Sequence, residues 1–142
     1  MPTPSKKASI PCHCINTRRA ANAITAYYDR MLEPCAVSVS QFSLLWSLDG
    51  LGSSNVTQLA GHVGLERSTV VRNIKLLQEK ELLEDAPESQ SRDRRIRVTP
   101  RGKALIEIGI PLWKQAQKDI YSLLGDADTD AFRRVLNALQ GL

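Results

Sequence analysis

Apolar residues recur every three to four positions along most of the chain, which is the spacing of helices with one buried face. This pattern predicts helices over residues 15–32, 40–48, 55–60, 66–80 and 100–124, and a sixth that carries Phe132, Val135, Leu136 and Leu139. Between the fourth and fifth helices the spacing changes, and residues 82–84 and 96–99 read as short strands. The pattern therefore predicts a mainly α fold with a small β-hairpin.

Turn and capping residues mark the expected ends of several helices. Asp49-Gly50 is expected to end the second helix, and residues 61–64 are expected to form a tight turn after the third. Asn55 and Asp128 are expected N-caps, because their side-chain oxygens can accept hydrogen bonds from free backbone N–H groups.

The composition is that of one globular domain with an aliphatic core. The chain has 142 residues, of which 42% are hydrophobic and only 5% aromatic, and this favours helices built on Leu, Ile, Val and Ala. No apolar run approaches the ~18–20 residues that span a bilayer. The first residues lack the apolar stretch of a secretory signal, and three cysteines do not make a disulfide scaffold. We expect a cytoplasmic protein without a membrane segment, with residues 1–11 as a flexible arm.

The net charge of +4 comes from one segment. Residues 92–103 contain six basic side chains and one acidic side chain, a local charge of +5, so the rest of the chain sums to −1. Such a block is typical of a surface that binds a polyanion. The alternative is a solvated loop that only raises solubility.

The order of elements around this block is typical of a winged helix-turn-helix. A short helix, a glycine turn and a longer helix precede the hairpin that carries the basic block. The longer helix of such a pair can enter the major groove of DNA and contact base edges. The DNA-binding residues expected on this helix and on the hairpin are Arg67, Ser68, Thr69, Arg72, Asn73, Lys75, Arg92, Arg94 and Arg95. An amphipathic helix pair with an exposed hairpin is the alternative without DNA.

These segments resemble those of MarR-type winged helix-turn-helix transcriptional regulators. The matching stretches are Asn55-Val56-Thr57-Gln58-Leu59-Ala60, residues 64–74, Leu82-Leu83 and Val98-Thr99-Pro100-Arg101-Gly102. The resemblance implies a mainly α fold with a two- to three-stranded β wing. Residues 36–99 would form the DNA-binding lobe, and residues 12–35 and 100–142 would form dimerisation helices.

The same resemblance implies a function in transcription. Its members are homodimers that bind a pseudo-palindromic operator in double-stranded DNA, usually as repressors. Release from the operator follows binding of a small ligand or oxidation of a cysteine.

Two positions depart from the family pattern. The family usually has glycine just before the first wing strand, where this chain has Glu81. The family wing usually holds an Asp-x-Arg pair, in which the carboxylate steadies the arginine for the minor groove. One register places Gln90 and Arg92 at these positions, and a shortened wing places Asp93 and Arg95 there.

The first helix contains a candidate redox sensor. Cys14 and Tyr28 lie 14 residues apart, which resembles a family branch that senses organic hydroperoxides through a cysteine held as thiolate by tyrosine hydroxyls. The second tyrosine of that branch falls on Val39. Cys12-His13-Cys14 is also a weak candidate for a soft-metal site, although we expect no metal. The alternative is that Cys14 and Cys35 are small buried apolar residues.

A small-molecule effector is the other trigger that the resemblance implies. Phe42 and Trp46 are candidates to line a cleft for an aromatic carboxylate between the dimerisation helices and the DNA-binding lobe. They are equally candidates for plain core residues.

The chain contains no motif of an enzyme. It has no phosphate-binding glycine loop, no HExxH motif and no nucleophile elbow, and we expect no cofactor. A winged-helix module that binds proteins without specific DNA binding is the alternative function, since a fold does not fix a function.

Overall fold

The computed structural model describes residues 11–142, so residues 1–10 of the expected arm lie outside the described part of the chain. Its helices are α1 (His13–Met31), α2 (Val39–Leu51), α3 (Val56–Val63), α4 (Arg67–Glu79), α5 (Pro100–Leu124) and α6 (Asp126–Gln140). A 3-10 turn, η1 (Glu33–Cys35), follows α1, and two strands, β1 (Leu83–Asp85) and β2 (Ile96–Val98), lie between α4 and α5. No helix among the described residues has the length and apolarity needed to cross a membrane.

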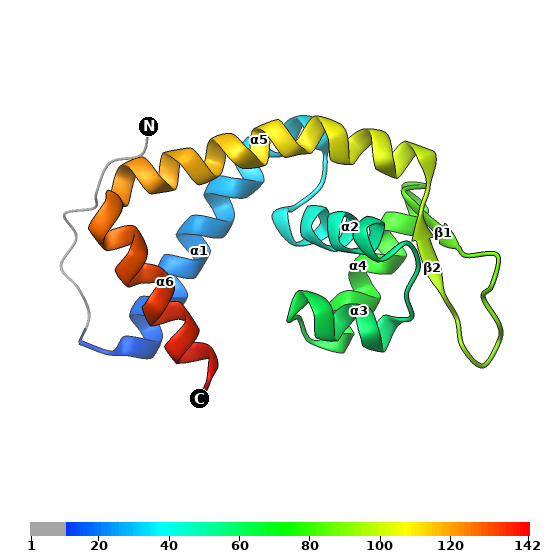
Figure 1. Cartoon of the computed structure of the whole chain (residues 1–142), viewed down its shortest axis with the longest axis horizontal. Helices are drawn as coiled ribbons and strands as arrows, with labels where there is room; N and C mark the ends of the chain where they lie inside the picture. Colours follow the sequence, from blue (N-terminus) through cyan, green and yellow to red (C-terminus); the bar gives the residue numbers. More distant parts are fainter. Residues whose placement is uncertain (1–10) are drawn as a thin grey trace.

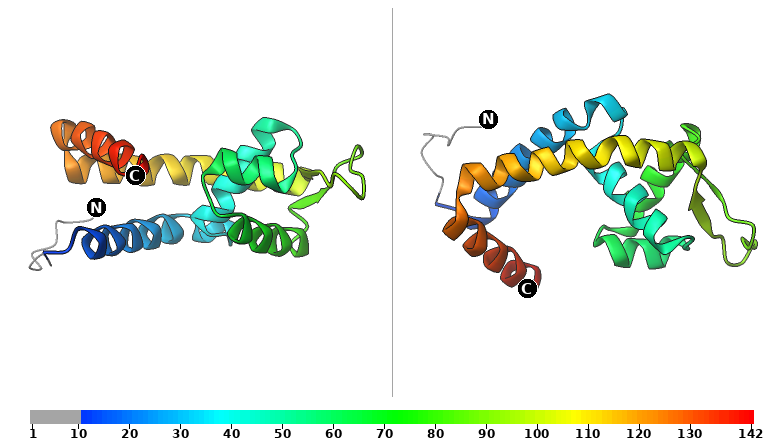
Figure 2. Two further views of the ribbon diagram at one scale, coloured as in Figure 1. Left: turned by 90° about the horizontal axis from the view of Figure 1, so that it is seen from below. Right: turned by 45° about the horizontal axis from the view of Figure 1, so that its top comes forward.

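The elements form an arch (Figure 1). Helix α5 runs along the top, α1 and α6 descend at one end, and α2, α3, α4 and the hairpin form a lobe at the other. In the view from below, α1 and α6 run in separate layers (Figure 2). The arrangement confirms the predicted winged-helix fold class.

Strands β1 and β2 form an antiparallel pair that pairs Leu83 with Val98 and Glu84 with Arg97. An isolated bridge between Ser54 and Ile96 adds a third short segment to this sheet. The wing is therefore two- to three-stranded, as expected. Side chains of Leu83, Ile96 and Val98 are buried, which anchors the base of the hairpin to the lobe.

Local capping explains where α2 and α3 begin. The Ser38 hydroxyl accepts a hydrogen bond from the Gln41 N–H at 3.2 Å, and the Gln41 side chain accepts one from the Ser38 N–H at 3.1 Å. Asp29 of α1 accepts a further bond from the Val39 N–H at 2.7 Å, which ties α1 to the start of α2. Asn55 caps α3 by accepting from the Gln58 N–H at 2.8 Å, as predicted.

Three predicted helix ends are wrong. Helix α2 continues through Asp49-Gly50 to Leu51, because the glycine with a positive φ is Gly52, at 81°. Helix α3 includes residues 61–63 and ends at Gly64, which has a φ of 69°, so the turn is shorter than expected. Helix α6 begins at Asp126 after Gly125, so Asp128 lies in its first turn and is not the N-cap. A carboxylate there interacts favourably with the positive end of the helix dipole.

The hydrophobic core lies in the lobe, and the opposite end of the arch contributes little to it. Phe42, Leu45, Leu48, Leu59 and Leu77 are all 1% exposed or less. By contrast, α1 buries only Tyr28 and α6 buries only Thr129. The α1–α6 end therefore has no sufficient core of its own.

Candidate nucleic-acid interface and ligand pocket

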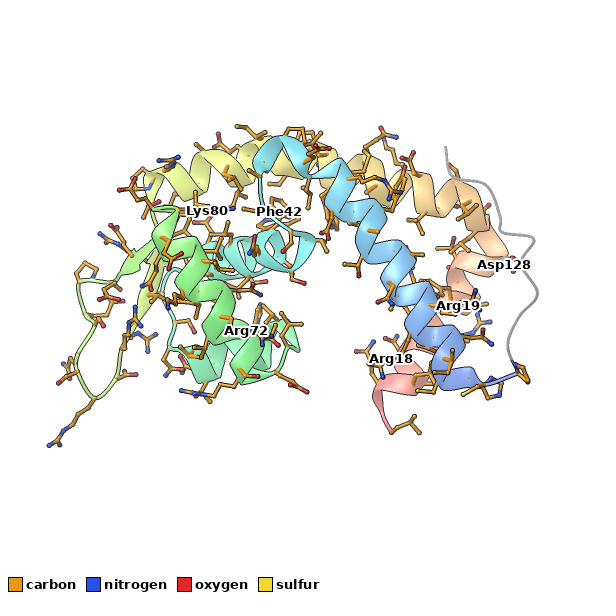
Figure 3. The ribbon with its side chains drawn as sticks, turned by 180° about the vertical axis from the view of Figure 1, so that it is seen from behind. Arg18, Arg19, Phe42, Arg72, Lys80 and Asp128 are labelled. Carbon is orange, nitrogen blue, oxygen red and sulfur yellow. The ribbon has the colours of Figure 1, made fainter. Side chains whose placement is uncertain are left out.

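Helix α4 presents a polar face away from the core. Val70, Ile74 and Leu77 are buried at helical spacing, as predicted. The opposite side exposes polar and basic side chains, namely Arg67, Ser68, Arg72 and Lys75. Figure 3 shows α4 running from Lys80, near α5, to Arg72 on the side of the lobe away from α5. This face is available to a partner outside the lobe.

Thr69 and Asn73 lie on the flank of α4, where both are half-buried. Arg72 donates a long hydrogen bond of 3.4 Å from Nη2 to the Thr69 hydroxyl. This contact steadies the exposed guanidinium on the helix without neutralising its charge.

Carboxylates offset most of the basic block in the wing. Arg94 pairs with Asp85 at 3.0 Å and Arg97 pairs with Glu84 at 2.9 Å, both across the hairpin. Residues 81–103 hold six basic and five acidic side chains, a net charge of +1, so the +5 counted over residues 92–103 overstates the local field. Such exposed pairs are each worth ~0–1 kcal/mol, so an arginine can exchange its carboxylate for a phosphate at little cost.

The tip of the wing is a turn that exposes Arg92. Gln90 and Asp93 exchange backbone hydrogen bonds of 3.1 Å, which leaves Ser91 and Arg92 at the turn. Among residues 11–142 no ion pair or hydrogen bond of the Arg92 side chain is found. Arg92 is therefore the exposed cation at the tip.

Arg95 is held against the lobe. Its Nη1 lies 3.7 Å from Asp93 Oδ2, and its Nη2 donates to the Ser53 carbonyl at 3.4 Å. Asp93 in turn accepts from the Asn55 amide at 3.3 Å. The geometry thus pairs Asp93 with Arg95, the arrangement of the shortened-wing register, and no hydrogen bond joins the side chains of Gln90 and Arg92.

Hydrogen bonds of Thr99 fix the base of the wing to the start of α5. The Thr99 hydroxyl accepts from the Gly102 N–H at 3.0 Å and donates to the Glu81 carbonyl at 2.8 Å. Glu81 has a φ of 60°, which explains why a glycine suits this position. Position 102 requires glycine for a steric reason, because a Cβ there would lie 2.4 Å from the Leu82 carbonyl oxygen.

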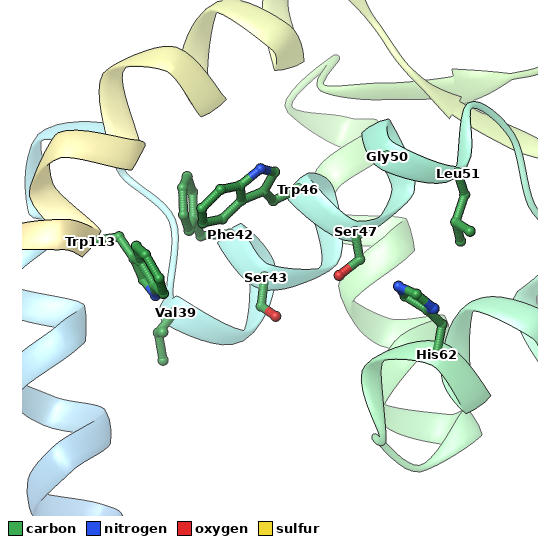
Figure 4. Close-up of a pocket in the computed structure, with 9 residues that line it drawn as sticks. All are labelled: Val39, Phe42, Ser43, Trp46, Ser47, Gly50, Leu51, His62 and Trp113. Carbon is green, nitrogen blue, oxygen red and sulfur yellow. The ribbon is translucent and has the colours of Figure 1, made fainter. Parts of the chain in front are cut away.

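An aromatic pocket of about 580 Å³ opens beside α2 (Figure 4). Phe42 and Trp46 line it, and Trp113 of α5 and His62 of α3 complete it. The Trp46 and Trp113 rings meet edge to face, with centroids 5.1 Å apart. His62 reaches from α3 toward Ser47 of α2. The remaining wall consists of Val39, Ser43, Ser47, Gly50 and Leu51.

Among residues 11–142, His62 is the sole ionisable side chain that lines the aromatic pocket. Because Trp113 belongs to α5 and the other lining residues belong to α2 and α3, a bound molecule would contact the lobe and the helix that connects the lobe to the α1–α6 end. Sequence reasoning missed Trp113 and His62, since no local spacing relates them to Phe42.

The cysteines are at two different places. Cys12 and Cys14 are exposed at the start of α1, and Cys35 is buried, which raises the pKa of its thiol. Cys14 and Tyr28 are separated by about 21 Å of helix, and the Tyr28 hydroxyl donates to the Gln117 side chain instead. The two residues therefore do not meet within one chain. Among residues 11–142 no three His, Cys, Asp or Glu side chains are grouped to hold a metal ion.

An apolar groove of about 350 Å³ separates α1 from α6. Ile24 of α1 faces the α6 stripe of Phe132, Val135, Leu136 and Leu139 across it. Val135 is 53% exposed and Leu139 is 44% exposed. No described part of the chain covers these faces.

Comparisons with known proteins agree with this geometry. The sequence model of the MarR family matches residues 37–96. The solved structure of the M. tuberculosis transcriptional regulator MosR in complex with DNA is 32% identical, with a TM-score of 0.79 over 92% of this chain and 95% of that one. No curated protein sequence gives a significant match.

Two more distant structures share the fold. Bordetella bronchiseptica BpsR, whose DNA binding is regulated by 6-hydroxynicotinic acid, is 21% identical with a TM-score of 0.82, over 96% of this chain and 99% of that one. The oxidised form of E. coli MarR is 16% identical with a TM-score of 0.71, over 93% and 96% of the two chains. Transcription regulators of this kind are not an enzyme family. From the winged helix-turn-helix, the matched segment and the identity to MosR, we conclude that the chain belongs to the MarR family of transcriptional regulators.

Proposed function

We propose that this protein is a homodimeric repressor that binds a pseudo-palindromic operator in double-stranded DNA and is released by a small ligand. The observation that carries the proposal is the exposed polar face of α4, with Arg67, Ser68, Arg72 and Lys75, in a lobe whose wing exposes Arg92 at its tip. Short side chains at the start of the helix permit close approach to base edges, and the arginines can contact guanine or phosphate. The MosR structure in complex with DNA supports this use of the fold.

Selection of duplexes from a random pool, followed by binding measurements at several salt concentrations, tests the proposal. Arg72→Ala should weaken operator binding by roughly 1–3 kcal/mol and relax one base position if Arg72 reads a base. Arg92→Ala, Arg94→Ala and Arg95→Ala should weaken all sequences alike, and each should reduce the salt slope by about one if the arginine that it removes binds one phosphate.

Lys118→Ala is the matched control, because Lys118 is an exposed cation on α5 outside the lobe. If no duplex binds in a salt-dependent way, the alternative of a winged-helix module for protein partners replaces the proposal.

The proposed dimer uses the groove between α1 and α6. Val135 and Leu139 are too exposed for a monomer, and a second copy that inserts the same helices would bury them. Light scattering should give twice the chain mass, and Leu136→Asp should shift it toward the monomer, whereas Arg134→Asp, at an exposed position outside the groove, should not. A monomer mass for the wild-type chain at micromolar concentration refutes the dimer.

The proposed effector is a flat aromatic molecule in the pocket of Phe42, Trp46 and Trp113. The pocket offers aromatic walls, two serine hydroxyls and one imidazole, which suit a ring with a polar substituent. Release requires that the ligand favours the arrangement that does not bind DNA, since equal affinity for both shifts nothing. Regulation of BpsR by 6-hydroxynicotinic acid is consistent with this chemistry.

The test titrates aromatic acids and phenols against tryptophan fluorescence and operator binding together. Ser47→Phe, which fills the pocket, should abolish both responses while leaving operator binding without ligand unchanged. A compound that still releases DNA from Ser47→Phe acts elsewhere.

Oxidation of Cys14 is a second candidate trigger, favoured by the exposure of Cys12 and Cys14. Contact between Cys14 and Tyr28 then requires two protomers. Measuring operator binding before and after mild peroxide, for wild type and Cys14→Ser, tests whether oxidation of Cys14 releases DNA. The redox trigger is excluded if the wild type keeps its affinity or if the serine variant loses it equally.

A further inference from the structure

A second groove, distinct from the aromatic pocket, lies where η1, the end of α4 and the start of α5 meet. Its volume is about 370 Å³, within the range of small-molecule sites. It shares no lining residue with the aromatic pocket or with the groove between α1 and α6. We call it the η1 groove.

The walls of the η1 groove are apolar. Leu82, Ala104 and Leu105 line it, together with Cys35, which is 7% exposed. Ile108, which also lines the groove, is 58% exposed, the highest exposure of any large apolar side chain in α5. An apolar ligand that contacted these walls would remove this surface from water.

Two cations belong to the same groove. Lys80 donates from Nζ to the backbone carbonyl of Ala36 at 2.5 Å, so its charge is not neutralised by this contact. Arg101 lies 3.3 Å from Glu81 Oε2, in a pair whose two side chains are 70% and 79% exposed. Glu81 does not line the groove. The η1 groove therefore combines apolar walls with two accessible positive charges.

We propose that the η1 groove is a second ligand site that binds an amphipathic organic anion, namely a carboxylate with an aliphatic tail. The tail contacts Leu82, Leu105 and Ile108, and the carboxylate accepts hydrogen bonds from Lys80 and Arg101. The site goes beyond the proposed aromatic effector, because it differs in position, in wall chemistry and in charge.

The chain provides a separate probe for each cavity. Both tryptophans of the chain line the aromatic pocket, and Cys35 lines the η1 groove. In a Cys12→Ser, Cys14→Ser background, Cys35 is the only thiol. Its rate of modification by an aromatic disulfide reagent reports occupancy of the η1 groove, and tryptophan fluorescence reports the other cavity.

Decanoate, kept below its micelle concentration, should slow the modification of Cys35 in a saturable way without changing tryptophan fluorescence. Lys80→Met and Arg101→Met should each weaken this protection about fivefold, and 1-decanol should protect far less than decanoate. Ala104→Phe should abolish protection by filling the groove. Lys103→Met is the matched control, because Lys103 pairs with Asp49 and does not line the groove.

Four results overturn the proposal. The first three are the absence of protection, equal protection by 1-decanol, and a fluorescence change at the concentrations that protect Cys35. The fourth is a change of oligomeric state in Ala104→Phe, which makes the groove an interface between copies of the chain. The first three leave operator binding without ligand, and hence the proposed repressor function, untouched.

Discussion

Replacing Gly102 by alanine tests whether the wing is fixed by close packing against the first turn of α5. The added Cβ would lie 2.4 Å from the Leu82 carbonyl oxygen and 2.6 Å from Val98 Cγ1. The Leu82 oxygen is backbone and already accepts a hydrogen bond from the Thr99 N–H at 3.1 Å. The clash is therefore relieved only if the wing base moves away from α5.

The magnitude follows from three contributions. Overpacking of a well-packed site costs about 1–3 kcal/mol, and loss of the Thr99–Leu82 hydrogen bond costs about 1 kcal/mol more. Alanine regains about 0.5–1 kcal/mol because it restricts the unfolded chain more than glycine in a helix. The free energy of unfolding should fall by about 2 kcal/mol, from the middle of these ranges.

Urea unfolding followed by circular dichroism measures this change, at one protein concentration because the proposed dimer would unfold in a concentration-dependent way. Gly61→Ala is the matched control, since Gly61 lies inside α3 and a Cβ there meets nothing within 4 Å. It should stabilise the protein by about 0.5–1 kcal/mol. A Gly102→Ala protein as stable as the wild type refutes the packing argument.

Three further outcomes follow from single positions. Glu81→Gly should raise the free energy of unfolding by about 0.5–1 kcal/mol in a urea titration, because a φ of 60° is strained for a residue with a Cβ; no gain means that the strain is absent. Burial raises the pKa of Tyr28 above its ordinary value of 10.0, so the stability that it contributes is complete below pH 10.0 and is lost as the pH rises through the higher folded-state pKa. Alkaline unfolding of Tyr28→Phe should accordingly show a weaker pH dependence than that of the wild type, and an identical profile contradicts this. Cys35 should react with a thiol reagent more slowly than Cys12 and Cys14, because it is buried and its pKa is raised; peptide mapping after brief labelling checks the order.

Sequence reasoning succeeded where one residue type decides a local outcome. The spacing of Val70, Ile74 and Leu77 places them on one face of α4, and the Asn55 amide can cap α3 with no help from distant residues. It failed at helix ends that offer two glycines. Gly50 and Gly52 are the same residue type, so the sequence offers both as the end of α2. Only the positive φ of Gly52 shows which of them ends the helix.

The candidate site depended on contacts that a linear pattern does not contain. The pairing of Arg94 with Asp85 and of Arg97 with Glu84 requires the register of the hairpin, so counting charges along residues 92–103 overestimated the field of the wing. Trp113 reaches the aromatic pocket because α5 packs directly against Phe42. A Cβ on Gly109 would lie 2.3 Å from that ring.

Helix α5 has the geometry of a lever. Its 25 residues extend for about 37 Å between the α1–α6 end and the base of the wing. A rotation of about 5° at one end moves the other by about 3 Å, close to the rise of ~3.4 Å for each base along a DNA strand. Pro111, which lacks an N–H group, lies inside α5 and makes bending easier there. In the proposed dimer, a small change of angle near the aromatic pocket would thus be enough to shift the two α4 helices out of step with the proposed half-sites, while each lobe keeps its internal structure.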